Sequence, residues 1–272
     1  MRYGIEIVPF GEFADPRAVV RLARAAEAAG WEAVWVWDHL SFPYGVADPW
    51  VMLAAVAAST STIRLLPGVA ALPRYKPALL ARLLASLDVL SSGRLILGAG
   101  LGALHDEFAA MGEPSDYATR AAMLDEGLAV LARLWTGEPV THRGAHYALE
   151  DLAIRPRPVQ QPRMPVWIGG ESRAALRRAA AWDGWIMGTT DENSQVTYPP
   201  QKVAAQVAVI EAERGETAAF DVAIDGVSQA GDERLMREYA DAGATWWFEL
   251  LFPLRGDEAA MLARVQAGPP RG

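Results

Sequence analysis

The sequence predicts an α/β fold, a single (β/α)8 TIM barrel with an insertion between helix 4 and strand 5. The length of 272 residues suits this fold, which typically needs about 250 residues, although two domains of about 135 residues would also fit. Short apolar segments alternate with helical segments eight times, which favours a closed barrel over an open sheet. No stretch rich in Pro, Gly and Ser divides the chain. We therefore expect one domain over residues 1–272.

Eight segments rich in Val, Ile, Leu and Trp are predicted as strands. Such short apolar segments are typical of parallel strands that are buried on both faces. The predicted strands are Tyr3–Val8, Ala33–Trp37, Ile63–Leu66, Arg94–Leu97, Val166–Ile168, Gly184–Met187, Phe220–Ile224 and Thr245–Leu250.

Helices are predicted between the strands. The first begins where Asp15 can cap it and Pro16 can occupy its first turn, and Gly30 ends it. The same chemistry starts the second helix at Asp48-Pro49, and Lys76-Pro77 starts the third. The remaining predicted helices are Asp116–Trp135, Ser172–Ala181, Gln201–Arg214, Asp232–Ala242 and Asp257–Val265.

The stretch Thr136–Pro165 interrupts the strand-helix pattern. Its alternating part, Val140–Leu149, predicts a small hairpin that turns near Arg143-Gly144. The proline-rich part, Arg155–Pro165, cannot join the interior of a sheet, so we expect an extended strap across the surface.

Charge and composition exclude several classes of function. The formal net charge of −8 argues against nucleic-acid binding, because an acidic chain repels phosphates. The absence of Cys excludes disulfides and a Cys nucleophile. No metal is expected, because His142 and His146 fall in the predicted hairpin and His105-Asp106-Glu107 indicates an exposed loop and helix start. With no signal peptide and no membrane span in the pattern, we expect a soluble cytoplasmic protein.

The most reactive candidates follow the second strand, because barrel active sites form where strands end and the next loops begin. His39 can move a proton or hydrogen-bond a developing charge. The neighbouring Asp38 can accept a bond from a ring N–H. Alternatively, Asp38 caps the turn and His39 is structural. We take both as catalytic candidates.

Glycines gather at the ends of the fourth and fifth strands. Gly98, Gly100 and Gly102 allow the backbone to approach a ligand, although a tight loop would explain them too. With Ala103 they match the dinucleotide fingerprint, but no helix is predicted directly after them and no acidic strand end follows about 20 residues later. The segment Gly169–Ser172 leads into a helix, where free N–H groups can bind phosphate or Ser172 can act only as a cap.

Taken together, these segments resemble the luciferase-like monooxygenase superfamily. The resemblance runs over most of the chain, in the family's order. It rests on Ala29–Leu40, Leu87–Gly100, Asp106-Glu107-Phe108, Arg120, Leu134–Gly137, Pro156–Pro158 and Val166–Gly170.

The resemblance implies a luciferase-like TIM barrel that binds reduced FMN or the deazaflavin coenzyme F420. It places Asp38 and His39 beside the ring system and implies a non-prolyl cis peptide at Gly68-Val69. The run Trp37–Leu40 is more similar to the F420-using branch. The candidate cofactor-binding residues are Gly68, Val69, Gly98, Gly100, Leu101, Gly102, Gly169, Gly170, Glu171 and Ser172.

Two departures from the family pattern bear on the substrate. Ala103 stands where sugar-phosphate dehydrogenases of the F420 branch carry a catalytic glutamate. The segment Asp191–Pro200 is short for a region that carries a longer insertion in many relatives. A sugar-phosphate substrate and a full lid over the site are therefore not expected.

Two versions of the chemistry remain open. With F420, hydride passes between the cofactor and a small organic substrate, with His39 moving the proton. With FMN, the reduced cofactor and oxygen oxygenate the substrate. Phe10, Val69 and Trp185 are candidate substrate contacts. A flavin or F420 reductase and a second copy of the chain are the expected partners.

Two rival classes are weighed against this oxidoreductase. One is a flavin-binding protein of the same fold without turnover. The other is a cofactor-free hydrolase or lyase, which would need paired acids or a lysine at the strand ends, and the sequence pattern indicates neither.

Overall fold

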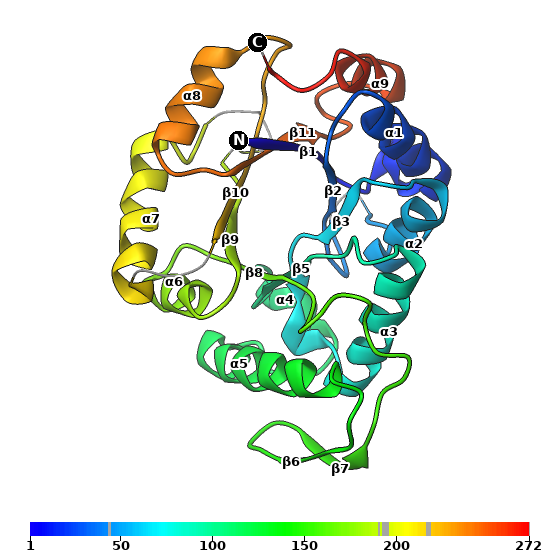
Figure 1. The fold of residues 1–272 in the computed structure, drawn as a ribbon, viewed down its shortest axis with the longest axis vertical. Helices are drawn as coiled ribbons and strands as arrows, with labels where there is room; N and C mark the ends of the chain where they lie inside the picture. The colour runs from blue at the N-terminus through cyan, green and yellow to red at the C-terminus, as the bar shows by residue number, and fades with distance from the viewer. Residues whose placement is uncertain (43–44, 190, 192–195, 216–218, 272) are drawn as a thin grey trace.

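The computed structural model describes residues 1–42, 45–189, 191, 196–215 and 219–271. Within these residues a ring of parallel strands is surrounded by helices (Figure 1). The strands of the ring are β1 (Arg2–Ile7), β2 (Ala33–Val36), β3 (Arg64–Pro67), β4 (Ala70–Ala71), β5 (Leu97–Gly100), β8 (Val166–Gly169), β9 (Gly184–Met187), β10 (Asp221–Gly226) and β11 (Trp246–Leu251).

The sheet closes into a barrel through the contacts of β3 and β4. The strand order is β3-β2-β1-β11-β10-β9-β8-β5-β4, so its two ends are segments that follow each other in the chain. Only Gly68 and Val69 separate them, and the peptide bond between these two residues is cis. A parallel bridge between Leu65 and Leu95 also joins β3 to the segment before β5. β3 and β4 therefore occupy one strand position of the barrel. The predicted barrel with eight strand positions is confirmed.

The eight predicted helices are present outside the barrel. They are α1 (Pro16–Ala28), α2 (Pro49–Ser59), α3 (Pro77–Leu90), α5 (Tyr117–Leu134), α6 (Arg173–Ala180), α7 (Pro200–Arg214), α8 (Glu233–Asp241) and α9 (Glu258–Gln266). The predicted caps of α1 and α2 are present. The side chain of Asp15 accepts a hydrogen bond from the backbone N–H of Arg17, and that of Asp48 accepts one from the backbone N–H of Val51, each at 2.9 Å. No helix of the described residues is long and apolar enough to cross a membrane.

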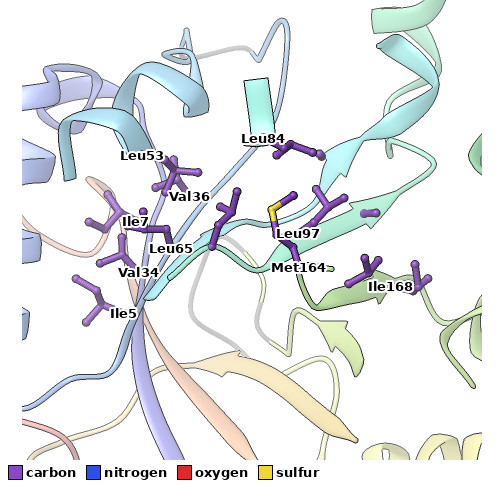
Figure 2. Close-up of a cluster of buried hydrophobic side chains, with 14 of the residues drawn as sticks. Ile5, Ile7, Val34, Val36, Leu53, Leu65, Leu84, Leu97, Met164 and Ile168 are labelled. Carbon is purple, nitrogen blue, oxygen red and sulfur yellow. The ribbon is translucent and has the colours of Figure 1, made fainter. Parts of the chain in front are cut away.

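Side chains alternate between two cores along each strand. Outward residues pack against the helices, and Figure 2 shows Ile5 and Ile7 of β1 and Val34 and Val36 of β2 near Leu53 of α2. Inward residues fill the barrel, as is typical of this fold. The buried residues of this inner cluster are Ala33, Trp35, Leu66, Ile96, Trp167, Ile186, Ala223, Trp246 and Phe248.

The predicted insertion consists of a hairpin and a strap. β6 (Val140–Arg143) pairs antiparallel with β7 (Ala148–Leu152), and the hairpin projects from the barrel (Figure 1). The strap is held by Asp88 at the end of α3, a buried carboxylate that accepts the amides of Val159 and Gln160 at 2.8 and 3.1 Å. The strap therefore lies against α3 through hydrogen bonds rather than by joining the sheet.

The fourth predicted strand differs from the observed one. β5 begins at Leu97, whereas the sequence pattern predicts Arg94–Leu97. Residues 94–96 instead pair with β3 through a single parallel bridge, with backbone hydrogen bonds from Leu65 to Arg94 at 3.0 Å and from Ile96 to Leu65 at 2.9 Å. Gly98 and Gly100 consequently lie inside the strand rather than in a loop after it.

A short helix, α4 (His105–Ala110), follows this strand and was not among the predicted helices. The sequence indicated a helix start at His105, and the helix begins there, three residues after Gly102 rather than directly after it. The two remaining turns of helix are of the 3-10 type, η1 (Gly11–Ala14) and η2 (Leu72–Arg74).

Candidate active site at the carboxyl end of the barrel

Asp38 follows β2 and is held on both of its carboxylate oxygens. The guanidinium of Arg74 lies 2.6 Å from one oxygen, and the other accepts the amide of Ala71 at 2.9 Å and the hydroxyl of Tyr75 at 3.0 Å. Burial and the nearby Asp38 charge raise the pKa of Tyr75, so the phenol remains a donor. These contacts hold the Asp38 carboxylate in place beside Arg74, and its catalytic role stays a prediction.

Glu107 on α4, like Arg74, is a residue of the site that the sequence pattern did not reveal. It is buried, not exposed as expected, and it faces the loop that follows β2. One carboxylate oxygen accepts the amides of Leu40 and Ser41 at 2.9 and 3.0 Å, and the other pairs with Arg74 at 2.8 Å. The only sequence signal for it was its place in the segment that resembles the family.

His39 is the half-buried member of this cluster, with 18% of its side chain exposed. Its Nδ1 atom lies 3.1 Å from Glu107. Because the Glu107 carboxylate already accepts three other hydrogen bonds, Nδ1 carries the proton and donates to it. Among the described residues no hydrogen-bond partner contacts Nε2, so a neutral His39 presents an unprotonated Nε2 at the end of the barrel.

The clustered glycines make room for the Gly68-Val69 segment. A Cβ atom at Gly100 would lie 2.6 Å from Cγ2 of Val69, and one at Gly169 would lie 2.9 Å from its Cγ1. A Cβ at Gly98 would collide with the carbonyl of Pro67. Packing therefore requires Gly100 and Gly169 beside Val69 and Gly98 beside Pro67, while their close approach to a ligand stays a prediction.

The connection after β5 is fixed by Arg120 from α5. The buried guanidinium donates to the carbonyls of Leu101 and Gly102 at 3.2 and 2.8 Å. Gly102 has a φ of +82°, and a Cβ there would lie 2.7 Å from the ring of Phe108. This connection is thus a rigid part of the rim.

The segment Gly169–Ser172 joins β8 to α6, with Gly170 at a φ of +117°. Ser172 caps α6, accepting the amide of Ala175 at 3.2 Å, which leaves the other first-turn N–H groups available to an anion. Glu171 instead forms an exposed ion pair with Lys202 at 3.0 Å.

The two expected substrate contacts differ in their placement. Phe10 lies at the rim, in a cluster with Val8, Leu250 and Phe252. Trp185 is fully buried in the cluster between strands and helices, and its indole donates to the carbonyl of Gly170 at 2.8 Å. The expected substrate contact at Trp185 is therefore wrong, because its ring faces the helices and holds the Gly170 connection.

Two buried acids lie inside the barrel below the rim. Glu6 of β1 accepts the indole N–H of Trp37, and Asp225 of β10 lies on the next strand but one of the barrel. Burial and the charge of Asp225 raise the pKa of Glu6 well above its ordinary value. Paired acids were sought in the sequence only at the strand ends, and these two inward carboxylates were not considered. The sequence signal that could have revealed these acids is a single carboxylate at an inward-facing position of an otherwise apolar strand, in β1 and again in β10.

The fold and this rim define a (β/α)8-barrel protein with a candidate cofactor site at the carboxyl ends of its strands. Residues 4–261 match the family described as luciferase-like monooxygenase. The chain belongs to this family, and the resemblance drawn from the sequence is confirmed. The family identifies the chain as an oxidoreductase.

Two relatives are named as F420-dependent enzymes. A glucose-6-phosphate dehydrogenase of Amycolatopsis mediterranei is 36% identical over 179 residues, which are 63% of this chain and 53% of the relative. A hydroxymycolic acid dehydrogenase of Mycobacterium tuberculosis is 33% identical over 211 residues, which are 75% of this chain and 58% of the relative. The chain thus spans little more than half the length of either relative.

A solved structure confirms the fold. It is an F420-dependent secondary alcohol dehydrogenase in complex with an F420-acetone adduct. It superposes with a TM-score of 0.82 at 16% identity, covering 99% of this chain and 98% of the other.

Proposed function

We propose that the protein is an F420-dependent oxidoreductase that transfers hydride between the deazaflavin and a small alcohol or carbonyl substrate. The F420-dependent relatives and the Trp37–Leu40 run support this cofactor. FMN with oxygen is the alternative cofactor chemistry, which the family description favours. The observation that carries the proposal is the contact of His39 with Glu107, because it prepares a proton acceptor at the rim.

The residues present fit a flat ring that carries a phosphate-bearing chain. Val69 projects from between β3 and β4 into the inner cluster and would support the ring. The connection of Leu101 and Gly102 would contact the chain, and Gly170 with the N-terminus of α6 would hold its phosphate. When bound, F420 supplies the site that accepts or gives the hydride.

His39 would handle the proton that accompanies the hydride. In alcohol oxidation Nε2 of His39 would accept the O–H proton, and the bound cofactor would supply the acceptor for the hydride that leaves the same carbon, so that a carbonyl product forms. Glu107 stabilises the imidazolium that forms, because its carboxylate holds Nδ1. In the reverse direction the same Nε2 returns the proton to the developing alkoxide.

The proposal is tested by titrating the purified protein with F420 and with FMN in parallel while following the fluorescence of each ring. Saturable binding of F420, followed by reduction of F420 with an alcohol, supports it. Tight binding with no substrate oxidation and no oxygen uptake would instead identify a non-catalytic binding protein. Binding of neither cofactor would overturn the assignment.

Val69 and Phe10 remain the proposed substrate contacts, since both lie near the rim. The homodimer, the reductase partner and the cytoplasmic location stay predictions. The short segment Asp191–Pro200, expected to form no full lid, lies partly outside the described residues.

A further inference from the structure

Apolar side chains gather on one side of the carboxyl end of the barrel. The strands β2, β1 and β11 end there side by side, because β1 pairs with both of the others. Four buried residues from the loop after β1 and from the end of β11 form one cluster, namely Val8, Phe10, Leu250 and Phe252. Trp37, directly after β2, packs against this cluster. These four residues and Trp37 are the apolar wall of the rim.

The apolar wall reaches the candidate proton acceptor. The ring of Trp37 lies edge-on to His39, with 5.6 Å between the ring centroids, and the ring of Phe42 lies 5.3 Å from His39 by the same measure. Trp37 and Phe42 are half-buried, so part of each residue remains exposed. A molecule whose hydroxyl group reaches Nε2 would therefore bring its carbon atoms against apolar rings.

Two exposed leucines lie next to the apolar wall in the chain. Leu40 follows His39 and is 51% exposed, and Leu254 lies two residues after Phe252 and is 55% exposed. Both belong to loops that follow parallel strands, so they flank the same mouth of the barrel as His39. Single exposed apolar residues need no explanation, but apolar side chains that adjoin a concave end with a reactive group are typical of a ligand site.

The arginines on this side of the rim are engaged with carboxylates. Arg74 is buried between two acids of the site. Arg255, in the loop after β11, pairs at 2.6 Å with Glu249, which has no exposed surface and also pairs with Arg264 of α9 at 3.2 Å. Glu249 lies on the helix side of β11, because Phe248 before it faces the barrel interior. Neither Arg74 nor Arg255 is therefore available to the phosphate of a substrate.

We propose that the substrate is an apolar alcohol, or the corresponding carbonyl compound, whose hydrocarbon part lies on the apolar wall and extends to Leu40 and Leu254. This inference deepens the proposed function and rests on it. The oxygen of the alcohol loses its proton to Nε2 of His39 and the adjacent carbon loses a hydride, for which F420 supplies the acceptor. Each methylene group removed from water favours binding, so kcat/KM should increase about two- to fourfold for each one.

The first measurement is the reduction of F420 by secondary alcohols from 2-propanol to 2-octanol. Five methylene groups separate the two ends of the series, so kcat/KM should increase about 30- to 1,000-fold. Glucose 6-phosphate, a polar and anionic alcohol, should reduce no F420 above background. If 2-propanol is oxidised but kcat/KM does not depend on chain length, this inference is overturned while the proposed function stands. Oxidation of glucose 6-phosphate as efficiently as 2-octanol would overturn it too.

Variants of exposed leucines locate the effect. L40S and L254S should each lower the ratio of kcat/KM for 2-octanol to that for 2-propanol by about tenfold, because part of the apolar contact is lost. L90S is the matched control, since Leu90 is 49% exposed at the end of α3, on the opposite end of the barrel. The ratio should not change in L90S. Equal ratios in all three variants would contradict the proposal.

A second measurement does not depend on turnover. Methyl NMR spectra are recorded with added 2-octanol, without and with F420, and the three variants identify the leucine signals. The signals of Leu40 and Leu254 should shift saturably, and that of Leu90 should not. Such shifts without any reduction of F420 would retain the apolar site and reject the proposed function. No shift of Leu40 or Leu254 under either condition would overturn the inference.

Discussion

The Nδ1 atom of His39 lies 3.1 Å from the carboxylate of Glu107, which orients the imidazole and leaves Nε2 as the proton acceptor. H39Q should therefore lower kcat about 10²–10⁴-fold, the usual contribution of a positioned acid or base. Binding of F420 should change little, because the amide keeps a polar group of similar size. Steady-state kinetics and a fluorescence titration measure the two quantities. H105Q is the control, since His105 is exposed beside Tyr117, and equal losses in both variants would refute the role of His39.

Arg74 joins the two buried carboxylates of the site. Its guanidinium pairs with Asp38 at 2.6 Å and with Glu107 at 2.8 Å, and all three side chains are at most 5% exposed. R74M would leave two buried charges without a partner, so we expect the free energy of unfolding to fall by about 3–5 kcal/mol. Urea denaturation followed by circular dichroism measures this loss.

An exposed ion pair provides the matched control for Arg74. Arg143 pairs with Glu150 at 2.9 Å, but the two side chains are 79% and 69% exposed. R143M should cost less than about 1 kcal/mol, because solvent screens such pairs. If R74M cost as little as R143M, the buried cluster would not hold the site together.

The barrel was predictable because local signals repeat along the chain. Apolar strands and capped helix starts such as Asp15-Pro16 depend on neighbours a few residues away, so the sequence pattern shows them directly. The start of β5 was missed because Leu95 pairs only through a single bridge with Leu65, on a strand about 30 residues earlier, and no local pattern records that. The position of His39 at a strand end was likewise visible from the strand pattern.

The partners of His39 could not be predicted in the same way. Glu107 is 68 residues away in sequence, and Arg74 is 35 residues from His39. Only closure of the barrel brings their loops together. The strand that contains Trp185 was predicted correctly. The register of the strand decides whether a residue faces the barrel interior or the helices, and the ring of Trp185 faces the helices.

The close packing of Val69 and Gly100 gives a test of coupling between them. G100A would place a Cβ 2.6 Å from Val69, and overpacking of this kind typically costs about 1–3 kcal/mol. V69A removes the atoms that collide, so the double variant should lose less stability than the sum of the single variants, with a coupling of about 0.5–3 kcal/mol. Denaturant unfolding of the four proteins completes the cycle.

Gly127 of α5 offers a control for that cycle. A Cβ there would lie 3.1 Å from Leu72 and would not meet Val69. G127A and V69A should therefore be additive within about 0.5 kcal/mol. Additivity in the Gly100 pair as well would show that Val69 does not occupy the space beside β5.

The raised pKa of Glu6 predicts how stability depends on pH. Its ordinary pKa is about 4.3, so above that pH the unfolded chain releases a proton that the folded protein keeps. The contribution of Glu6 to stability is thus complete below about pH 4.3 and falls as pH rises toward the folded pKa, by at most about 1.4 kcal/mol per pH unit.

In the E6Q variant this pH-dependent contribution to stability is absent. The unfolding free energy of the natural protein minus that of E6Q should consequently decrease between pH 5 and pH 8 in urea titrations. The groups whose pKa values are lowered by folding, such as Glu27, act equally in both proteins and cancel. A difference for E6Q that stays constant with pH would mean that folding does not raise the pKa of Glu6.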